Sequence, residues 1–122
     1  MRIDDSSGIR VLHLEADGEP ISTPDDASDL IGTAWSHQAN TVAVPVERLD
    51  PEFFRLRSGI AGEITQKFAN YRLRLAVIGD ITKAVGKSTA MRDFVRETNR
   101  GDHVWFLADE AALDDKLAGR AQ

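Results

Sequence analysis

The sequence feature that most constrains the fold is an apolar strand that directly follows an amphipathic helix. Residues 60–71 place apolar side chains on one helical face, and residues 73–78 form an almost unbroken apolar run that ends at Gly79-Asp80. A strand this apolar needs cover on both of its faces, which is typical of the middle of a parallel sheet. The sequence therefore predicts an α/β fold that is organised around this helix and this strand.

The other segments of the chain alternate between expected strands and expected helices. Strands are expected at residues 9–14, 19–22, 41–46, 73–78 and 103–108. Helices are expected at residues 23–40, 60–71, 88–101 and 109–117. This alternation predicts a mainly parallel sheet of four to five strands, with right-handed crossovers and flanking helices. If the first two strands pair as a hairpin through the turn at Asp17-Gly18, the N-terminal edge of the sheet is antiparallel.

Helix ends and the two tryptophans carry further local expectations. Thr23 is expected to cap the first helix, and Ser88 is expected to cap the third. Gly101 is expected to end the third helix in the left-handed backbone conformation that glycine adopts easily. Trp35 and Trp105 are expected to pack in the core or just beneath its rim.

The composition is that of a soluble globular protein. The chain has 122 residues, of which 42% are hydrophobic and 29% charged, and we interpret it as one domain over residues 1–122 with loose ends at residues 1–8 and 119–122. It contains no cysteine, so it forms neither a disulfide nor a thiolate metal site. No apolar run approaches the roughly 18 residues of a membrane span, and residues 1–10 do not resemble a signal peptide. We therefore expect a cytoplasmic protein without membrane contact.

Ligands and partners of α/β proteins meet the loops that follow the carboxyl ends of the parallel strands. Here these loops are residues 47–58, residues 79–88 and the turn at Asp109. Phe53 and Phe54 are interpreted as anchors of the first loop to the core. The candidate binding residues of the first two loops are Arg57, Ser58, Asp80, Lys83, Lys87 and Ser88.

The second loop contains part of a phosphate-binding motif. In G-x-x-x-x-G-K-[ST], backbone amides wrap the phosphates, and Gly86-Lys87-Ser88 matches the end of this pattern. The first glycine would have to be residue 81, which is Ile81, and Gly79 comes too early. We therefore reject a nucleotide-hydrolysing loop. A looser alternative is an anion held by the amides after Ser88, with lysines nearby, and the plainer one is a solvated loop with a capping serine.

No residue pattern indicates a catalytic or metal site. His13, His37 and His103 have no ligand spacing with one another or with carboxylates. Asp80 is the best-placed carboxylate for acid–base chemistry, but carboxylates at strand ends also hold loops through hydrogen bonds. We expect no catalytic residue, no metal and no cofactor, and we lean against an enzyme.

A series of motifs runs along the chain from Phe53 to Asn99. They are Phe53-Phe54, Ser58 to Ile64, Gln66-Lys67-Phe68, Asn70-Tyr71-Arg72, Val77 to Asp80, Arg92 to Val95 and Asn99. With these motifs the chain resembles an uncharacterised bacterial family that is catalogued as domain of unknown function 4180, and the similarity covers nearly the whole chain. The resemblance implies a family but no activity.

The order of strands and helices also resembles the STAS domain, the fold of anti-sigma factor antagonists. Residues 58–62, SGIAG, lie where the Asp-Ser-Ser-Gly-Leu-Gly motif of that fold starts the second helix. In regulatory STAS domains a serine there is phosphorylated and switches partner binding, so the resemblance implies Ser58 as a phosphorylation site with Arg57 beside it. The motif's aspartate is missing, because Leu56 and Arg57 precede Ser58. The alternative, which we favour, is that Ser58 simply caps the helix.

These expectations favour a regulatory domain that binds a protein partner, or a second copy of itself, around Arg57-Ser58 and residues 80–88. The net charge of −5 argues against nucleic acid as a partner. The alternative is a small-anion or nucleotide-ligand binding protein, or a small enzyme, that uses the pocket near residues 80–88. A deep apolar cleft beside Asp80 would favour this alternative, and a shallow, filled strand-end face would favour the interaction domain.

Overall fold

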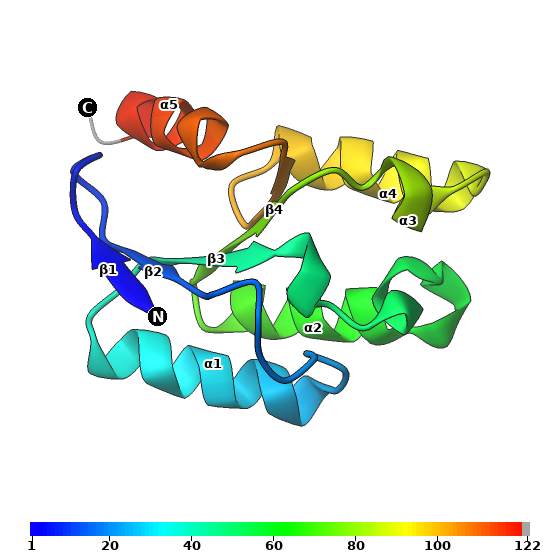
Figure 1. The fold of residues 1–122 in the computed structure, drawn as a ribbon, viewed down its shortest axis with the longest axis horizontal. Helices are drawn as coiled ribbons and strands as arrows, with labels where there is room; N and C mark the ends of the chain where they lie inside the picture. The colour runs from blue at the N-terminus through cyan, green and yellow to red at the C-terminus, as the bar shows by residue number, and fades with distance from the viewer. Residues whose placement is uncertain (121–122) are drawn as a thin grey trace.

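The computed structural model describes residues 1–120 and shows a five-stranded sheet flanked by helices (Figure 1). The strands lie across the sheet in their sequence order. They are Arg2–Asp4 (β1), Val11–His13 (β2), Thr41–Pro45 (β3), Arg74–Ile78 (β4) and Val104–Leu107 (β5). β1 pairs with β2 in antiparallel orientation, and every other neighbouring pair is parallel. The expected mainly parallel α/β sheet with an antiparallel N-terminal edge is confirmed.

Helices connect these strands. The α-helices are Pro24–Ser36 (α1), Ile60–Asn70 (α2), Thr82–Val85 (α3), Thr89–Arg100 (α4) and Glu110–Arg120 (α5). Short 3-10 helices follow β3 at Val46–Arg48 (η1), Pro51–Phe54 (η2) and Leu56–Ser58 (η3). The longer helices lie where the sequence predicts them, whereas α3, η1, η2 and η3 occupy segments that are expected to be loops.

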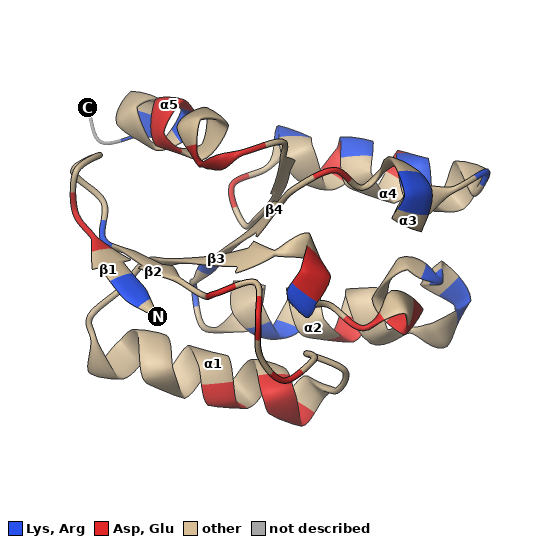
Figure 2. Ribbon diagram, viewed as in Figure 1, with Lys and Arg blue, Asp and Glu red and all other residues tan. Residues whose placement is uncertain are grey.

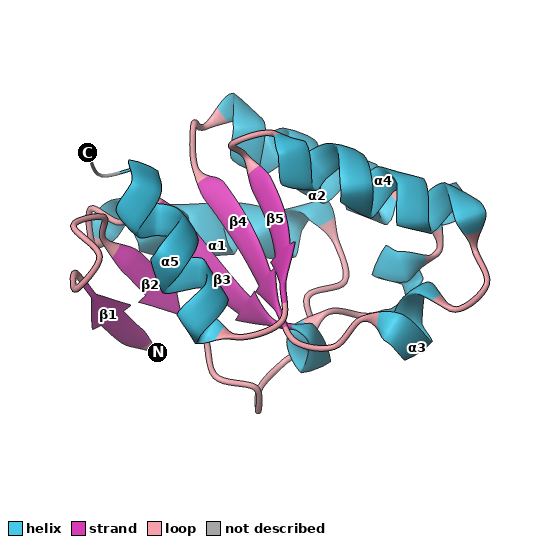
Figure 3. Cartoon of the chain, turned by 90° about the horizontal axis from the view of Figure 1, so that it is seen from above, coloured by secondary structure: helices cyan, strands magenta, loops and turns pink. Residues whose placement is uncertain are grey.

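Side chains of each strand alternate between the two faces of the sheet, so each face has its own core. On one face, α1, α2 and α4 pack against the buried strand residues Leu12, Val42, Val44, Leu75, Val77, Val104 and Phe106. On the other face, α5 packs against the buried residues Val11, Ala43, Ala76 and Trp105. Figure 1 shows α1 and α2 on one side of the sheet and α5 on the opposite side, and Figure 3 shows α5 crossing over the strands. β4 is therefore covered on both faces, as its apolar sequence requires.

Both ends of the described chain differ from the expectation. β2 pairs with β1 and not with residues 19–22, of which Ile21 forms only an isolated parallel bridge with Leu49. β1 covers residues 2–4 of the segment expected over residues 1–8 to be loose, and it lacks an apolar signal because an exposed edge strand is held mainly by backbone pairing. At the other end α5 continues to Arg120, beyond the expected end at Leu117. Residues 121 and 122, also expected to be loose, lie outside the described part of the chain.

All three residues expected to cap helices occupy cap positions, one of them in a different conformation from the one predicted. Thr23 forms a capping box with Asp26, whose N–H donates to the threonine hydroxyl at 3.2 Å. The Ser88 hydroxyl accepts a hydrogen bond from the Met91 N–H at 3.1 Å and caps α4. Gly101 ends α4 at the expected position, but the left-handed conformation predicted for it is wrong, because its φ is −91° and its backbone is extended.

The two tryptophans lie in different environments. Trp105 is fully buried beneath α5, as expected. The prediction for Trp35 is wrong, because its side chain is 60% exposed at the end of α1 and packs edge to face against exposed Tyr71, with ring centroids 5.9 Å apart. Helical periodicity gives the direction of the buried face but not its width, and Trp35 lies beyond the edge of that face.

Candidate functional site

The connection after β3 fills the surface beyond the carboxyl ends of the strands. η2 holds Phe53 and Phe54, which are 0% and 6% exposed, and their rings lie edge to face 5.2 Å apart. The Phe53 ring also lies 6.4 Å from the ring of Phe106 in β5. Both phenylalanines anchor this connection in the core, as expected.

An open groove of about 630 Å³ lies between η3 and the α3–α4 segment. It is lined by Phe54, Arg55, Leu56, Arg57, Ala84, Val85, Lys87, Ser88, Thr89 and Ala90. The groove brings together three of the expected site residues, Arg57, Lys87 and Ser88. The other three, Ser58, Asp80 and Lys83, lie outside the lining of the groove.

The groove is basic, although the whole chain carries a net charge of −5. Arg55 forms an ion pair with Glu52 at 2.9 Å, which neutralises one of the lining cations. Within residues 1–120, Arg57 and Lys87 form no ion pair with a carboxylate. Figure 2 shows basic segments on α3 and along α4, and acidic segments in the first half of α1. The positive charge of the groove is therefore local.

The amino end of α4 opens onto the groove. Ser88 satisfies the N–H of Met91, and the next two residues, Thr89 and Ala90, line the groove. The first turn of α4 contains no acidic residue, so the helix does not neutralise its own positive end. A negatively charged group in the groove would be stabilised both by this helix end and by Lys87.

Ser58 lies just before α2 and holds the local backbone. Its hydroxyl donates a hydrogen bond to the Glu52 carbonyl at 2.7 Å and accepts one from the Ile60 N–H at 3.2 Å. The N-cap position itself is occupied by Gly59, whose φ of 80° is left-handed. Ser58 thus satisfies the first N–H of the helix without being its cap residue, and its side chain is exposed.

Asp80 is exposed at the end of β4, and its carboxylate holds the start of α3. Hydrogen bonds from the Thr82 hydroxyl and backbone N–H, the latter at 2.9 Å, lower the pKa of Asp80 below its ordinary value. A carboxylate with a lowered pKa is a poor proton donor at neutral pH. Lys83, on α3, is also exposed and lies close enough to lower the same pKa further.

The three histidines lie on different elements. His13 is buried in β2, whereas His37 and His103 are exposed. Among residues 1–120, no group of three or more His, Cys, Asp or Glu side chains is arranged to hold a metal ion. Over the same residues, no helix combines the length and the apolar character needed to cross a membrane.

Sequence reasoning missed part of the groove wall. Arg55 and Leu56 line it beside Arg57, and Ala84 and Val85 of α3, which packs against η2, line it as well. The spacing of Arg55 and Arg57 in a loop at the strand ends was an available signal for a basic surface. The contribution of α3 carried no such signal, because a single helical turn has too few residues for a periodic pattern.

The comparison with curated proteins and the comparison with solved structures each find no match. The resemblance to the STAS domain therefore stays a prediction. A protein-family model, in contrast, matches residues 6–117 of the 122-residue chain, which include both expected loops and the whole groove. The chain therefore belongs to the family described as Domain of unknown function (DUF4180).

Proposed function

We propose that this protein is a regulatory interaction domain that binds an acidic segment of a partner protein in the groove between η3 and α4. The observation that carries this proposal is the pair of cations Arg57 and Lys87, which line one open groove while no carboxylate of residues 1–120 pairs with them. Cations placed this way attract an acidic segment and fix its register. The lack of cysteine fits a reducing compartment such as the cytoplasm.

The lining of the site supports a protein partner. The groove is open and lies above buried Phe53 and Phe54. Its basic residues alternate with the apolar side chains of Leu56 and Val85. This mixture suits a peptide segment that combines carboxylates with apolar side chains.

The same observations argue against acid–base catalysis at the strand ends. Asp80 is exposed and lies outside the groove. Hydrogen bonds from Thr82 stabilise its ionised form by lowering its pKa. It holds the loop, which is the plainer of the two roles considered for it. The interaction domain therefore accounts for the site without a reaction.

A small anion is the second candidate occupant, because the amino end of α4 faces the groove beside Lys87. Phosphorylation of Ser58 would add regulation of the STAS type. A phosphate on its hydroxyl would remove the hydrogen bond that Ser58 donates to the Glu52 carbonyl and would place negative charge next to Arg57. Unchanged partner binding by Ser58→Ala and Ser58→Glu would count against this regulation.

The proposal is tested by affinity capture from the native cell extract, with identification by mass spectrometry. The wild type is compared with Arg57→Ala/Lys87→Ala and with the control Arg96→Ala/Arg100→Ala, which removes the same charge from α4 outside the groove. Arg96 and Arg100 form exposed ion pairs within α4, so their loss changes stability little.

We expect one specific protein that is captured by the wild type and the control but lost with the groove variant. Equal capture by all three proteins would contradict the proposal. If no protein is captured but native mass spectrometry shows a bound anion that the groove variant lacks, the small-anion function replaces it. Size-exclusion chromatography of the three proteins shows whether the partner is a second copy of the chain.

A further inference from the structure

A second cavity, of about 510 Å³, lies at the amino ends of the strands, at the opposite end of the sheet from the groove. It is lined by Gly8, Ile9, Asn40, Arg72, Arg74, Asp102, His103 and Arg120. Its lining is mainly polar, and guanidinium groups contribute the charge. Its volume is in the range of small-molecule sites.

Cations converge on one aromatic ring beside this cavity. Arg74 lies 4.3 Å from the centre of the Trp105 ring, Lys116 lies 4.6 Å from it, and Arg120 lies 5.5 Å from it. Trp105 is fully buried, and its Nε1–H donates to the Gly101 carbonyl at 2.7 Å, which fixes the ring. Cation–π attraction to a fixed ring thus holds the three side chains close together.

The positive charge around the cavity exceeds the negative charge. Of the described residues that line it, Asp102 is the one carboxylate, against three arginines. The Asp102 carboxylate forms an ion pair with Arg120 at 2.8 Å, and Arg74 donates a hydrogen bond to the Asp102 backbone carbonyl at 2.9 Å. Three guanidinium charges against one carboxylate leave a surplus of two positive charges, and Lys116 adds to it.

This surplus has an electrostatic cost in the protein without a ligand. Burial, and then the charges of Arg120 and Arg74, lower the pKa of Lys116 below its ordinary value, with Asp102 opposing them. Burial also lowers the pKa of Arg74. Asp102 opposes this shift, and repulsion from Arg120 adds to it. An anion in the cavity would offset both the repulsion and the lost hydration of these groups.

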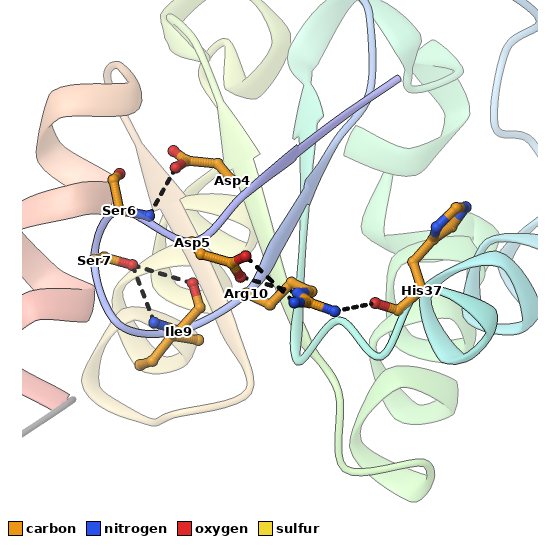
Figure 4. Close-up of polar contacts among 7 residues, drawn as sticks. All are labelled: Asp4, Asp5, Ser6, Ser7, Ile9, Arg10 and His37. Carbon is orange, nitrogen blue, oxygen red and sulfur yellow. Dashed lines mark hydrogen bonds and ion pairs between the residues drawn. The ribbon is translucent and has the colours of Figure 1, made fainter.

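The wall of the cavity beside Gly8 is fixed by its own hydrogen bonds (Figure 4). Arg10 binds both carboxylate oxygens of Asp5, at 2.9 and 3.3 Å, and donates to the His37 carbonyl at 3.1 Å. The Ser7 hydroxyl donates to the Ile9 carbonyl at 3.2 Å. This wall is therefore in place before a ligand arrives, and little ordering would be needed on binding.

We propose that this cavity binds a small molecule with at least two negative charges, either a phosphorylated compound or a polycarboxylate. The two chemistries share what the site offers, which is planar guanidinium groups that bind pairs of anionic oxygens. A dianion would balance the surplus of two positive charges on the residues that line the cavity. The site is separate from the groove and would allow a metabolite to act on the domain independently of the partner.

The test uses the fluorescence of Trp105, because the ring lies under the cations that would bind the ligand. The chain contains two tryptophans, so Trp35→Phe leaves Trp105 as the single reporter. This protein is titrated with pyrophosphate, with citrate, and with sodium chloride at matched ionic strength. Pyrophosphate and citrate separate the phosphate chemistry from the carboxylate chemistry.

We expect a saturable change in Trp105 emission with pyrophosphate or citrate and none with chloride. In the same background, Arg72→Asn should raise the midpoint at least tenfold; asparagine tolerates the left-handed φ of 58° at this position. Arg96→Gln, on the outer surface of α4, and the groove variant Arg57→Ala/Lys87→Ala should leave the midpoint unchanged. Because the groove variant lacks the cations beside the amino end of α4, an unchanged midpoint shows that the anion is not bound there.

A response that is absent or only linear with both polyanions would overturn the proposal. An unchanged midpoint in Arg72→Asn would do the same. Circular dichroism confirms that each variant is folded, and Arg120→Gln provides a second cavity variant if Arg72→Asn is not.

Discussion

Replacing Phe53 by alanine tests whether the connection after β3 is anchored in the core and thereby forms the groove wall. Phe53 is fully buried and contacts the rings of Phe54 and Phe106. Truncation of such a side chain costs about 3 to 5 kcal/mol in the free energy of unfolding. For 122 residues, an unfolding entropy of about 2.1 cal/mol/K per residue converts this into a fall in melting temperature of about 12 to 20 °C.

Urea unfolding monitored by circular dichroism measures the loss, and an unchanged m value shows that the shift in midpoint reports a change in stability. Phe94→Ala is the matched control, because Phe94 approaches the same Phe106 ring, at 6.4 Å, but is only partly buried. We expect Phe94→Ala to cost about half as much or less, since less apolar surface returns to water. A loss below about 1 kcal/mol for Phe53→Ala, or equal losses for both variants, would refute the anchoring role.

Three further substitutions test local features of the fold. His13 is 5% exposed, its Nε2 has no hydrogen-bond partner within the described chain, and burial lowers its pKa from 6.5. The unfolded state therefore takes up a proton first, so stability should fall as the pH drops below about 6.5 and through the lower folded pKa. Urea titrations between pH 7 and 5 should show this loss of stability for the wild type and His37→Leu but not for His13→Leu. An equal dependence of stability on pH in all three proteins would contradict the prediction. Thr23→Ala removes a capping hydrogen bond and should cost about 1 kcal/mol in the same assay, whereas no loss would show that the cap is dispensable. Gly79 has a φ of 137°, and a Cβ there would lie 2.7 Å from Cγ1 of Val46. Gly79→Ala should therefore lower the free energy of unfolding by about 1 to 3 kcal/mol, measured by thermal melts. A neutral effect would mean that this turn rearranges freely.

The elements that the sequence predicts best are those with strong local or periodic signals. β4 is recognisable from its apolar run because it is buried on both faces, and α1 from the capping chemistry of Thr23. β1 has no such signal, because an edge strand depends on backbone pairing with β2, which sequence patterning does not encode. Gly101 shows the opposite error, in which a local preference is overridden by the path of the chain into β5.

The candidate sites divide in the same way. The rule that parallel sheets present their binding loops at the carboxyl strand ends leads to Arg57, Lys87 and Ser88, and the structure places these three in one groove. The cavity at the amino ends lies outside the reach of that rule. Two of its three arginines, Arg72 and Arg120, come from segments far apart in the chain, and only the packing of α5 on the sheet brings them together.

The most direct test of the groove as a binding site is the dissociation constant of the captured partner for three proteins under one set of conditions. These are the wild type, Arg57→Ala/Lys87→Ala and Arg96→Ala/Arg100→Ala, measured by isothermal titration calorimetry. We expect the groove variant to bind on the order of tenfold more weakly, a loss of about 1.4 kcal/mol, and the control to bind like the wild type. Equal weakening in both variants would show a nonspecific effect of net charge, and no weakening in either would place the partner elsewhere on the molecule.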